Sequence, residues 1–332
     1  MTSAPSVVCC GPLAVSVRAA DDELLAKVHE ALELFDVRWE GPWRNVELQV
    51  RWAEAPAPMG PGGYLTCARM AVDSADEGLR VTTDNGSSAV GAFSEDGERW
   101  SIEARPELLR GDPRNYLLDL EDIVELALTT GWRRAGWVPM HAATVVRDGT
   151  CAFLCAQSGG GKTTLTASLV RRGWRAVGDD KGLLRCTDDE PPLVKALQHS
   201  FNLDPWVRTW FPEVGDLEQL PRYSLWTEKR KVRIVDIWPA GVATSACPTH
   251  LVQVSRIPEA GGGSIEPLSP TDVLGILLRQ TVVPSDPNAA RPIVNTVVKT
   301  AQRLSGVRVL VPEGAYDDPR VLAAVEEALI TS

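Results

Sequence analysis

A glycine-rich segment near the middle of the chain combines the residue types that hold phosphate. It reads Ala156-Gln-Ser-Gly-Gly-Gly-Lys-Thr-Thr164. The glycines allow consecutive backbone N–H groups to wrap an anion, Lys162 can reach the outer phosphates, and the Thr163 hydroxyl can sit on a magnesium ion. We therefore expect a nucleoside triphosphate and Mg²⁺ to bind here. The expected phosphate-binding residues are Ser158, Gly159, Gly160, Gly161, Lys162, Thr163 and Thr164.

The segments on either side of this loop supply the structural context that such a site requires. Cys151–Ala156 is apolar and predicts a buried strand, and Thr164–Arg172 predicts a helix closed by Gly173. A strand, a glycine-rich loop and a helix in this order are typical of a phosphate-binding loop. The pattern G-x-x-x-x-G-K-[ST] is incomplete in one place, because Ala156 occupies the first glycine position.

A tight hairpin is expected immediately before the loop. Met140–Val146 and Cys151–Ala156 read as strands, and Asp148-Gly149 between them is a strong two-residue turn signal. The register that follows from this turn sets His141 opposite Ala156. His141 is therefore expected at the mouth of the loop.

Two adjacent carboxylates follow the next predicted strand. That strand is Arg175–Gly178, and Asp179-Asp180 comes directly after it, seventeen residues beyond Lys162. Carboxylates near a bound triphosphate can ligate magnesium or accept a proton. Neighbouring residues of a strand point to opposite faces, so Asp179 and Asp180 are expected to have different roles.

In this order, these elements resemble those of the HPr kinase/phosphorylase family. The resemblance implies an α/β fold with a P-loop core of the phosphoenolpyruvate carboxykinase type and a mixed sheet. It also implies an ATP- and Mg²⁺-dependent kinase that transfers the γ-phosphoryl group to a hydroxyl. The matching segments are His141-Ala-Ala143, Gln157–Thr164 and Arg172–Asp180, with weaker matches at Asn202–Trp206 and Glu228–Lys231.

The resemblance also implies roles for individual residues. Asp179 would be the base for the acceptor hydroxyl, and Asp180 would join Thr163 at the metal. His141 would tune the base by hydrogen bonding. The implied catalytic residues are His141, Lys162, Asp179 and Asp180.

A basic cluster and a tryptophan pair leave two interpretations open each. Lys229 and Arg230 would either meet phosphate charge in the transition state or form a solvated turn before the next strand. Trp206 and Trp210 follow the N-cap signal Asp204-Pro205 and are four residues apart, so they are expected on one helix face. Core packing is the favoured role for this pair, and a lip for nucleotide or acceptor is the alternative.

The chain departs from HPr kinases after the aspartate pair, where it lacks their glutamate- and glycine-rich loop. HPr is therefore not the expected acceptor. We expect a serine-type hydroxyl of a peptide, small protein or small molecule, as in relatives of this family that act in natural-product biosynthesis.

Two other functions are compatible with a phosphate-binding loop. A nucleotide-binding regulatory or scaffold protein without phosphotransfer is the main alternative. A transport ATPase is disfavoured because no L-S-G-G-Q-like segment follows the loop helix, and guanine specificity has no N-K-x-D support.

The remainder of the chain predicts a second domain. Residues 1–115 alternate short β-like runs with polar turns and predict an α+β accessory domain that binds a substrate or partner. Residues 116–332 are the predicted catalytic domain. Asp112-Pro113 is expected to open a helix that runs to about Trp132.

Composition limits the partners and the compartment. A net charge of −10 over 332 residues disfavours nucleic acid and anionic membranes as partners. The seven cysteines include no C-x-x-C pair, which favours a reducing cytoplasm. No run of eighteen apolar residues occurs, and the first residues do not resemble a signal peptide. The sequence leaves open whether the protein forms a homo-oligomer.

Overall fold

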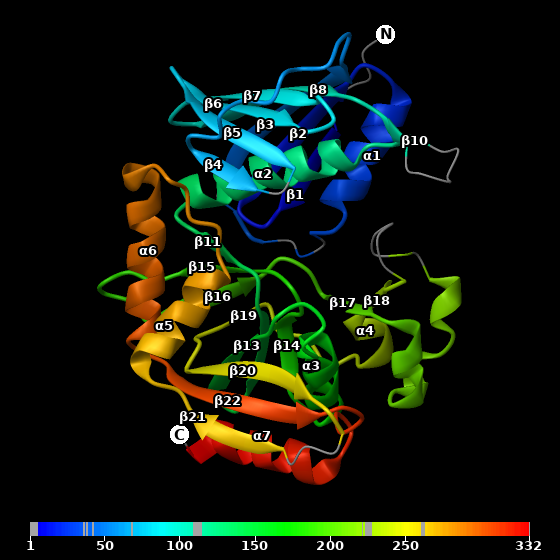
Figure 1. Ribbon diagram of the computed structural model, residues 1–332, viewed down its shortest axis with the longest axis vertical. Helices are drawn as coiled ribbons and strands as arrows, with labels where there is room; N and C mark the ends of the chain where they lie inside the picture. The colour runs from blue at the N-terminus through cyan, green and yellow to red at the C-terminus, as the bar shows by residue number, and fades with distance from the viewer. Residues whose placement is uncertain are drawn as a thin grey trace. The chain divides into compact units, whose positions relative to one another are not determined.

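The chain forms two compact units, each of which mixes helices and strands (Figure 1). The first holds residues up to Trp137 together with Val283–Ile293, and the second holds Val138–Val282 and the residues from Val294 onward. The expected mixed α/β architecture is confirmed. This computed structural model describes residues 6–35, 37, 39–41, 43–67, 69–108, 115–220, 222, 228–259 and 263–331.

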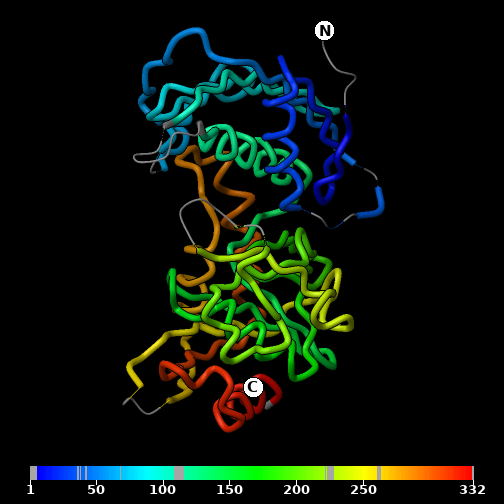
Figure 2. The backbone as a smooth tube through the Cα atoms, turned by 90° about the vertical axis from the view of Figure 1, so that its right-hand side faces the viewer, coloured from blue at the N-terminus to red at the C-terminus, as the bar shows by residue number. Residues whose placement is uncertain are grey.

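An eight-stranded sheet with two helices on one face makes up most of the first unit (Figures 1 and 2). Its strand order is β1-β2-β3-β8-β7-β6-β5-β4, in which β2, β3 and β8 run parallel and the other pairs are antiparallel. The strands are β1 (Ser6–Cys10), β2 (Leu13–Ala19), β3 (Arg44–Trp52), β4 (Leu65–Cys67), β5 (Met70–Ala75), β6 (Gly78–Thr83), β7 (Ser88–Phe93) and β8 (Gly97–Ala104), with a separate short pair β9 (Glu107–Leu108) and β10 (Asn115–Tyr116).

Helices α1 (Asp22–Leu32) and α2 (Leu118–Arg134) bury their apolar sides against this sheet. The Asp21 carboxylate caps α1 by accepting the Leu24 N–H at 2.9 Å. Near the carboxyl end of α2, the buried Trp132 ring meets the Phe35 ring edge-on, with 5.2 Å between the ring centres. Because α2 packs on the sheet, the unit boundary follows Trp137 and not residue 115 as predicted. The predicted helix start, Asp112-Pro113, lies outside the described residues.

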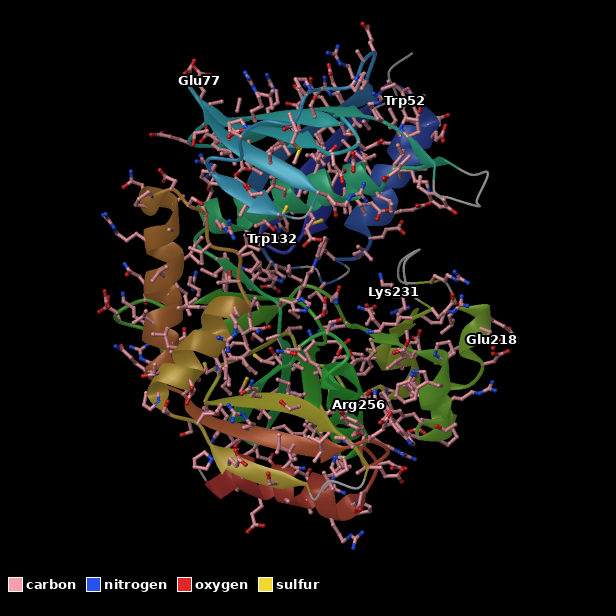
Figure 3. The ribbon with its side chains drawn as sticks, in the orientation of Figure 1. Trp52, Glu77, Trp132, Glu218, Lys231 and Arg256 are labelled. Atoms are coloured by element: carbon pink, nitrogen blue, oxygen red, sulfur yellow. The ribbon has the colours of Figure 1, made fainter. Side chains whose placement is uncertain are left out.

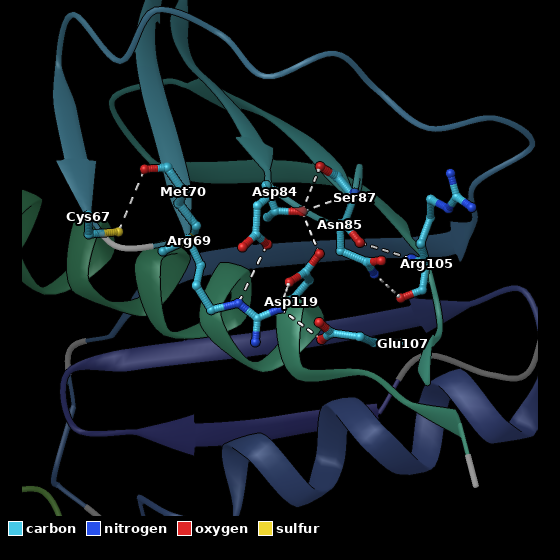
Figure 4. Close-up of polar contacts among 10 residues, drawn as sticks. Cys67, Arg69, Met70, Asp84, Asn85, Ser87, Arg105, Glu107 and Asp119 are labelled. Atoms are coloured by element: carbon cyan, nitrogen blue, oxygen red, sulfur yellow. Dashed lines mark hydrogen bonds and ion pairs between the residues drawn. The ribbon is translucent and has the colours of Figure 1, made fainter. Parts of the chain in front are cut away.

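A charged network joins the start of α2 to the sheet of the first unit (Figure 4). The Arg69 guanidinium donates to Glu107 at 2.7 Å and to Asp119 at 2.8 Å, and lies 3.6 Å from Asp84. Asp119 is almost fully buried and also accepts the Thr83 hydroxyl. The buried carboxylate of Asp119 is thus paired and hydrogen bonded, as buried charged groups in proteins usually are.

A six-stranded sheet forms the centre of the second unit, in the order β14-β12-β13-β20-β22-β21. β13, β20 and β22 are parallel, and β14 points the same way because both β13 and β14 are antiparallel to β12. The carboxyl ends of β13, β14, β20 and β22 therefore meet at one edge, which is where ligands bind in such sheets. The strands are β12 (Ala143–Arg147), β13 (Thr150–Cys155), β14 (Arg175–Gly178), β20 (His250–Ile257), β21 (Ser264–Pro267) and β22 (Ser305–Pro312).

Smaller sheets and several helices complete this unit. α3 and α7 cover the same face of the six-stranded sheet, since Leu165 and Leu169 of α3 share one core with Leu322 and Val325 of α7. The remaining strands are β11 (Val138–Met140), β15 (Gly182–Arg185), β16 (Leu193–Ala196) and β19 (Ser245–Ala246) in one sheet and β17 (Ser200–Leu203) with β18 (Arg230–Arg233) in another. The helices are α3 (Lys162–Arg171), α4 (Ile234–Ile237), α5 (Pro270–Arg279), α7 (Pro319–Thr331) and the 3₁₀ turns η1 (Pro205–Thr209), η2 (Pro212–Val214) and η3 (Leu217–Gln219). α6 (Pro287–Ala301) is divided between the units, because its residues up to Ile293 belong to the first unit and those from Val294 to the second.

The hairpin before the glycine-rich loop is confirmed, but its first strand is shorter than predicted. Asp148 and Gly149 have φ of 50° and 85°, as a two-residue turn requires. The register is the predicted one, with Val146 opposite Cys151, but the last pair joins Ala143 to Leu154, so His141 does not pair with Ala156 as predicted. The chain changes sheets at this point: β11 pairs with β15, and the His141 N–H donates to the Gln280 carbonyl at 2.7 Å.

Candidate functional site

The glycine-rich loop, residues 156–161, joins β13 to α3 at the edge where the carboxyl ends of the parallel strands meet. Gly159 and Gly161 have φ of 76° and 87°, which other residues rarely adopt. α3 begins at Lys162, so its free N–H groups and positive dipole end face the loop. The local geometry therefore suits an anion.

Tyr316 packs directly on this loop. Its hydroxyl donates to the Gly160 carbonyl at 3.3 Å. A Cβ atom at Gly161 would lie only 1.8 Å from the same hydroxyl, so a side chain at this position would displace the tyrosine. Gly161 is therefore required both for its backbone conformation and for this close approach.

A cavity of about 420 Å³ opens above the loop, a volume in the range of small-molecule sites. Its walls come from the loop, the first turn of α3, Asp180 after β14, the segment around β17 and η1, and the residues at or after the carboxyl ends of β20 and β22. The side chains that line it besides the loop and Lys162–Thr164 are His141, Asp180, Asn202, Leu203, Asp204, Trp206, Val207, Lys229, Arg256 and Tyr316.

Lys162, Asp180 and His141 form one charged cluster in this cavity. Lys162 Nζ lies 2.8 Å from Asp180 Oδ1 and 3.3 Å from His141 Nε2, and His141 Nδ1 lies 3.5 Å from the same carboxylate oxygen. Burial alone would raise the pKa of Asp180, but the charges of Lys162 and His141 and the hydrogen bond from Lys162 outweigh it and lower that pKa. Asp180 is therefore ionised and faces the cavity.

Asp179 has a different environment. It is fully buried, its Oδ2 accepts the Thr163 hydroxyl at 3.0 Å and the Asn202 N–H at 3.4 Å, and it is not among the residues that line the cavity. Complete burial raises the pKa of Asp179 to about 7, against the opposing charge of Lys162. The two aspartates thus have different partners, as expected from their alternation along the chain.

The pair Asp179–Thr163 fits a magnesium ion. Asp179 Oδ1 is buried and has no hydrogen-bond partner among the described residues, and the Thr163 hydroxyl stands beside this carboxylate. Mg²⁺ is commonly held by one or two protein oxygens together with phosphates and waters. Such a site needs no closed cage of protein ligands, and the described part of the chain contains no group of three or more His, Cys, Asp or Glu residues that would make one.

The expected site residues are mostly gathered in this one place. The loop residues, His141, Asp180 and Lys229 line the cavity, and Asp179 lies behind Thr163. Arg230 is not one of the lining residues, and its guanidinium donates to the Leu220 carbonyl at 3.0 Å.

Two lining residues have no local sequence signal. Arg256 lies near the carboxyl end of β20 (Figure 3), and Tyr316 follows β22. Only the parallel order of β13, β20 and β22 brings them beside the loop. Arg256 and Tyr316 could therefore have been identified from the sequence only together with the order of these strands.

Comparison with known proteins adds little to this geometry. The chain matches no protein-family model and no curated protein. Among solved structures, it is similar to the HPr(Ser) kinase/phosphatase from Coxiella burnetii, with a TM-score of 0.33 and 10% sequence identity over 58% of this chain and 99% of that one. At this level of similarity, the arrangement of the site itself is the basis for assigning chemistry. No helix within the described ranges is long and apolar enough to cross a membrane.

Proposed function

We propose that this protein is an ATP- and Mg²⁺-dependent phosphotransferase that moves the γ-phosphoryl group to a serine-type hydroxyl of a peptide, small protein or small molecule. The observation that carries the proposal is the Lys162–Asp180–His141 cluster, which lies in the same cavity as the glycine-rich loop. Phosphoryl transfer needs an anion cradle, a cation at the outer phosphates and an ionised group for the acceptor hydroxyl.

The loop and the first turn of α3 would hold the β- and γ-phosphates through backbone N–H groups. Lys162 would then divide its charge between the γ-phosphate and Asp180. When bound, magnesium supplies neutralisation of phosphate charge, and Thr163 and Asp179 are the residues that would hold it.

Asp180 is proposed as the residue that receives the acceptor's proton. As the hydroxyl oxygen bonds to the γ-phosphorus, the bond to the β,γ-bridging oxygen breaks and the hydroxyl proton passes to Asp180. The resemblance to HPr kinases implied Asp179 for this role, and its pKa near 7 would suit a base. A general base must first lie within hydrogen-bonding distance of the proton that it accepts, whatever its pKa. Asp180 is the aspartate that faces the cavity, so it is the one that an acceptor hydroxyl could reach.

Substitution of Lys162 and Asp180 tests the proposal. Lys162→Ala and Asp180→Asn should each lower transfer of the γ-phosphoryl group by about 100-fold or more, because charge stabilisation and proton acceptance each contribute that much. Transfer from γ-labelled ATP to free serine and to serine-containing peptides measures this. Lys27→Ala and Asp188→Asn are matched controls, since both side chains lie outside the site in ion pairs with Glu30 and Lys299.

Retained transfer in both site variants would contradict the proposal. ATP binding with no transfer to any hydroxyl by the unaltered protein would favour the alternative of a nucleotide-binding regulatory or scaffold protein.

A further inference from the structure

A row of three aromatic rings runs from the glycine-rich loop to the surface of the cavity. Tyr316, which touches the loop at Gly160, lies 5.6 Å from the Trp210 ring, and Trp210 meets Trp206 edge-on at 4.8 Å. Trp206 and Tyr316 both line the cavity, and Trp210 packs against the core beneath them. The sequence left packing and a ligand-binding lip as alternatives for this tryptophan pair.

The exposure of the two tryptophans separates those alternatives. Trp210 is partly buried in the core, whereas Trp206 is 44% exposed and has its ring at the cavity wall. A flat ring on a cavity wall is suited to stacking on another flat ring. Packing thus accounts for Trp210, whereas Trp206 lines the cavity and stays accessible to a ligand.

The sheet order places Tyr316, the first ring of this row, on the side of the loop away from Asp180. β14, which leads to Asp179 and Asp180, lies on one side of β13, and β22, which leads to Tyr316, lies on the other. Lys162 points toward Asp180, so the outer phosphates belong on the β14 side. A nucleotide bound with its outer phosphates on that side can extend its ribose and base toward Tyr316 and the rest of the aromatic row, which lines the same cavity at Tyr316 and Trp206.

We propose that Trp206 is the platform on which the nucleobase of the bound triphosphate stacks, with Trp210 and Tyr316 holding its ring in place. The inference rests on the nucleotide site of the proposed function, but it does not depend on phosphoryl transfer. A base stacked on an aromatic ring gains affinity largely independently of its identity, so the platform itself does not discriminate among purines.

The experiment compares ATP with inorganic tripolyphosphate, which has the same phosphate chain but no base. In calorimetric titrations with Mg²⁺, Trp206→Ala should weaken ATP binding about 10-fold or more, as expected from loss of one stacked base. Its affinity for tripolyphosphate should stay within about twofold of the unaltered protein. Trp206→Phe keeps a ring and should retain most of the ATP affinity. Trp43→Ala is the matched control, because Trp43 is 45% exposed and lies in the first unit.

Two other results would contradict stacking of the base on Trp206, and each assigns the ring a different role. Equal weakening of ATP and tripolyphosphate would mean that Trp206 supports the loop and does not stack on the base. Unchanged ATP binding with a raised KM for the acceptor would place the ring at the acceptor instead.

Different results would contradict the proposed function and the proposed stacking on Trp206. Trp206-dependent ATP binding without phosphoryl transfer would contradict the proposed function alone, and transfer without this dependence would contradict the inference alone. No binding of ATP to the unaltered protein would contradict both.

Discussion

At the scale of single residues, two adjacent aspartates are ionised to different extents because the fold solvates them differently. Asp179 is fully buried and its pKa is raised to about 7. Asp180 faces the cavity beside Lys162 and His141, and its pKa is lowered. Because its pKa is raised, the ionised Asp179 carboxylate destabilises the folded protein when no metal is bound. Because its pKa is lowered, the ionised Asp180 carboxylate stabilises the folded protein.

Substitution of Asp179 should therefore raise stability under alkaline conditions. Between about pH 4, where the unfolded carboxyl ionises, and about pH 7, where the folded one does, the unaltered protein loses stability as pH rises. Asp179→Asn removes this loss, so without nucleotide or metal the variant should unfold at higher denaturant concentration at pH 8. The gain should vanish toward pH 4.

Asp180→Asn is the matched control for this measurement. Because the pKa of Asp180 is lowered in the folded protein, its ionised carboxylate stabilises the fold. This stabilisation is fully present above the pKa of the unfolded carboxyl and is lost as the pH falls through the pKa of the folded one. This variant should be less stable than the unaltered protein at pH 8. If both substitutions shift stability in the same direction at that pH, the contrast between the two carboxylates is wrong.

At the scale of elements, a buried carboxylate joins α7 to the hairpin and to the end of α3. Glu326 of α7 accepts from Arg147 at 2.7 Å, from Arg172 at 2.6 Å and from the Trp174 indole N–H at 2.9 Å. The Arg147 guanidinium also lies 4.7 Å from the centre of the Trp174 ring. These contacts fix the far end of α3, whose first turn forms part of the candidate site.

Loss of the Glu326 charge should destabilise the second unit. Glu326→Gln is expected to lower the free energy of unfolding by about 3 kcal/mol, because two arginines lose their buried partner. Burial by itself would raise the pKa of Glu326, but hydrogen bonds from Arg172, Trp174 and Arg147 outweigh it and lower that pKa.

The effect of this substitution should depend on pH. The stabilisation by Glu326 is present above its unfolded pKa and is lost as the pH falls through the lowered folded value, so the variant and the unaltered protein should converge in acid. Urea denaturation at several pH values measures this, with the exposed neighbour Glu327→Gln as the control. A difference that persists in acid would assign the effect to packing.

At the scale of the whole molecule, the candidate chemistry belongs to one of the two units. The residues that line the cavity all lie in the second unit. In the first unit, the sheet face away from α1 and α2 carries ion pairs, such as Glu47 with Arg99 at 2.9 Å and with Arg18 at 3.9 Å. Such a face is suited to contact with water.

Nucleotide binding should therefore protect only the second unit. Hydrogen–deuterium exchange with and without MgATP should show slower exchange in peptides that cover residues 156–164 and 202–207, and unchanged exchange over residues 6–108. Lys162→Ala should remove the protection. Protection in the first unit would mean that it takes part in nucleotide binding.

The sequence by itself determined the features that depend on neighbouring residues. The glycines of the loop, Lys162 and Thr163 after them, and the turn at Asp148-Gly149 follow from local backbone preferences, and the structure has them where they were expected. The mixed α/β architecture follows from the alternation of apolar periods. The roles of the site residues stay predictions until substitution tests them.

Only the tertiary structure decided which distant residues meet at the site. The change of sheet at His141, the membership of α2 in the first unit, and the arrival of Tyr316 beside Gly160 depend on strand order and packing between segments far apart in the chain. Such contacts have no period of 2 or 3.6 residues to reveal them. The same reason applies to the two adjacent aspartates. The packing of the strands around them decides that Asp179 is buried and that Asp180 faces the cavity.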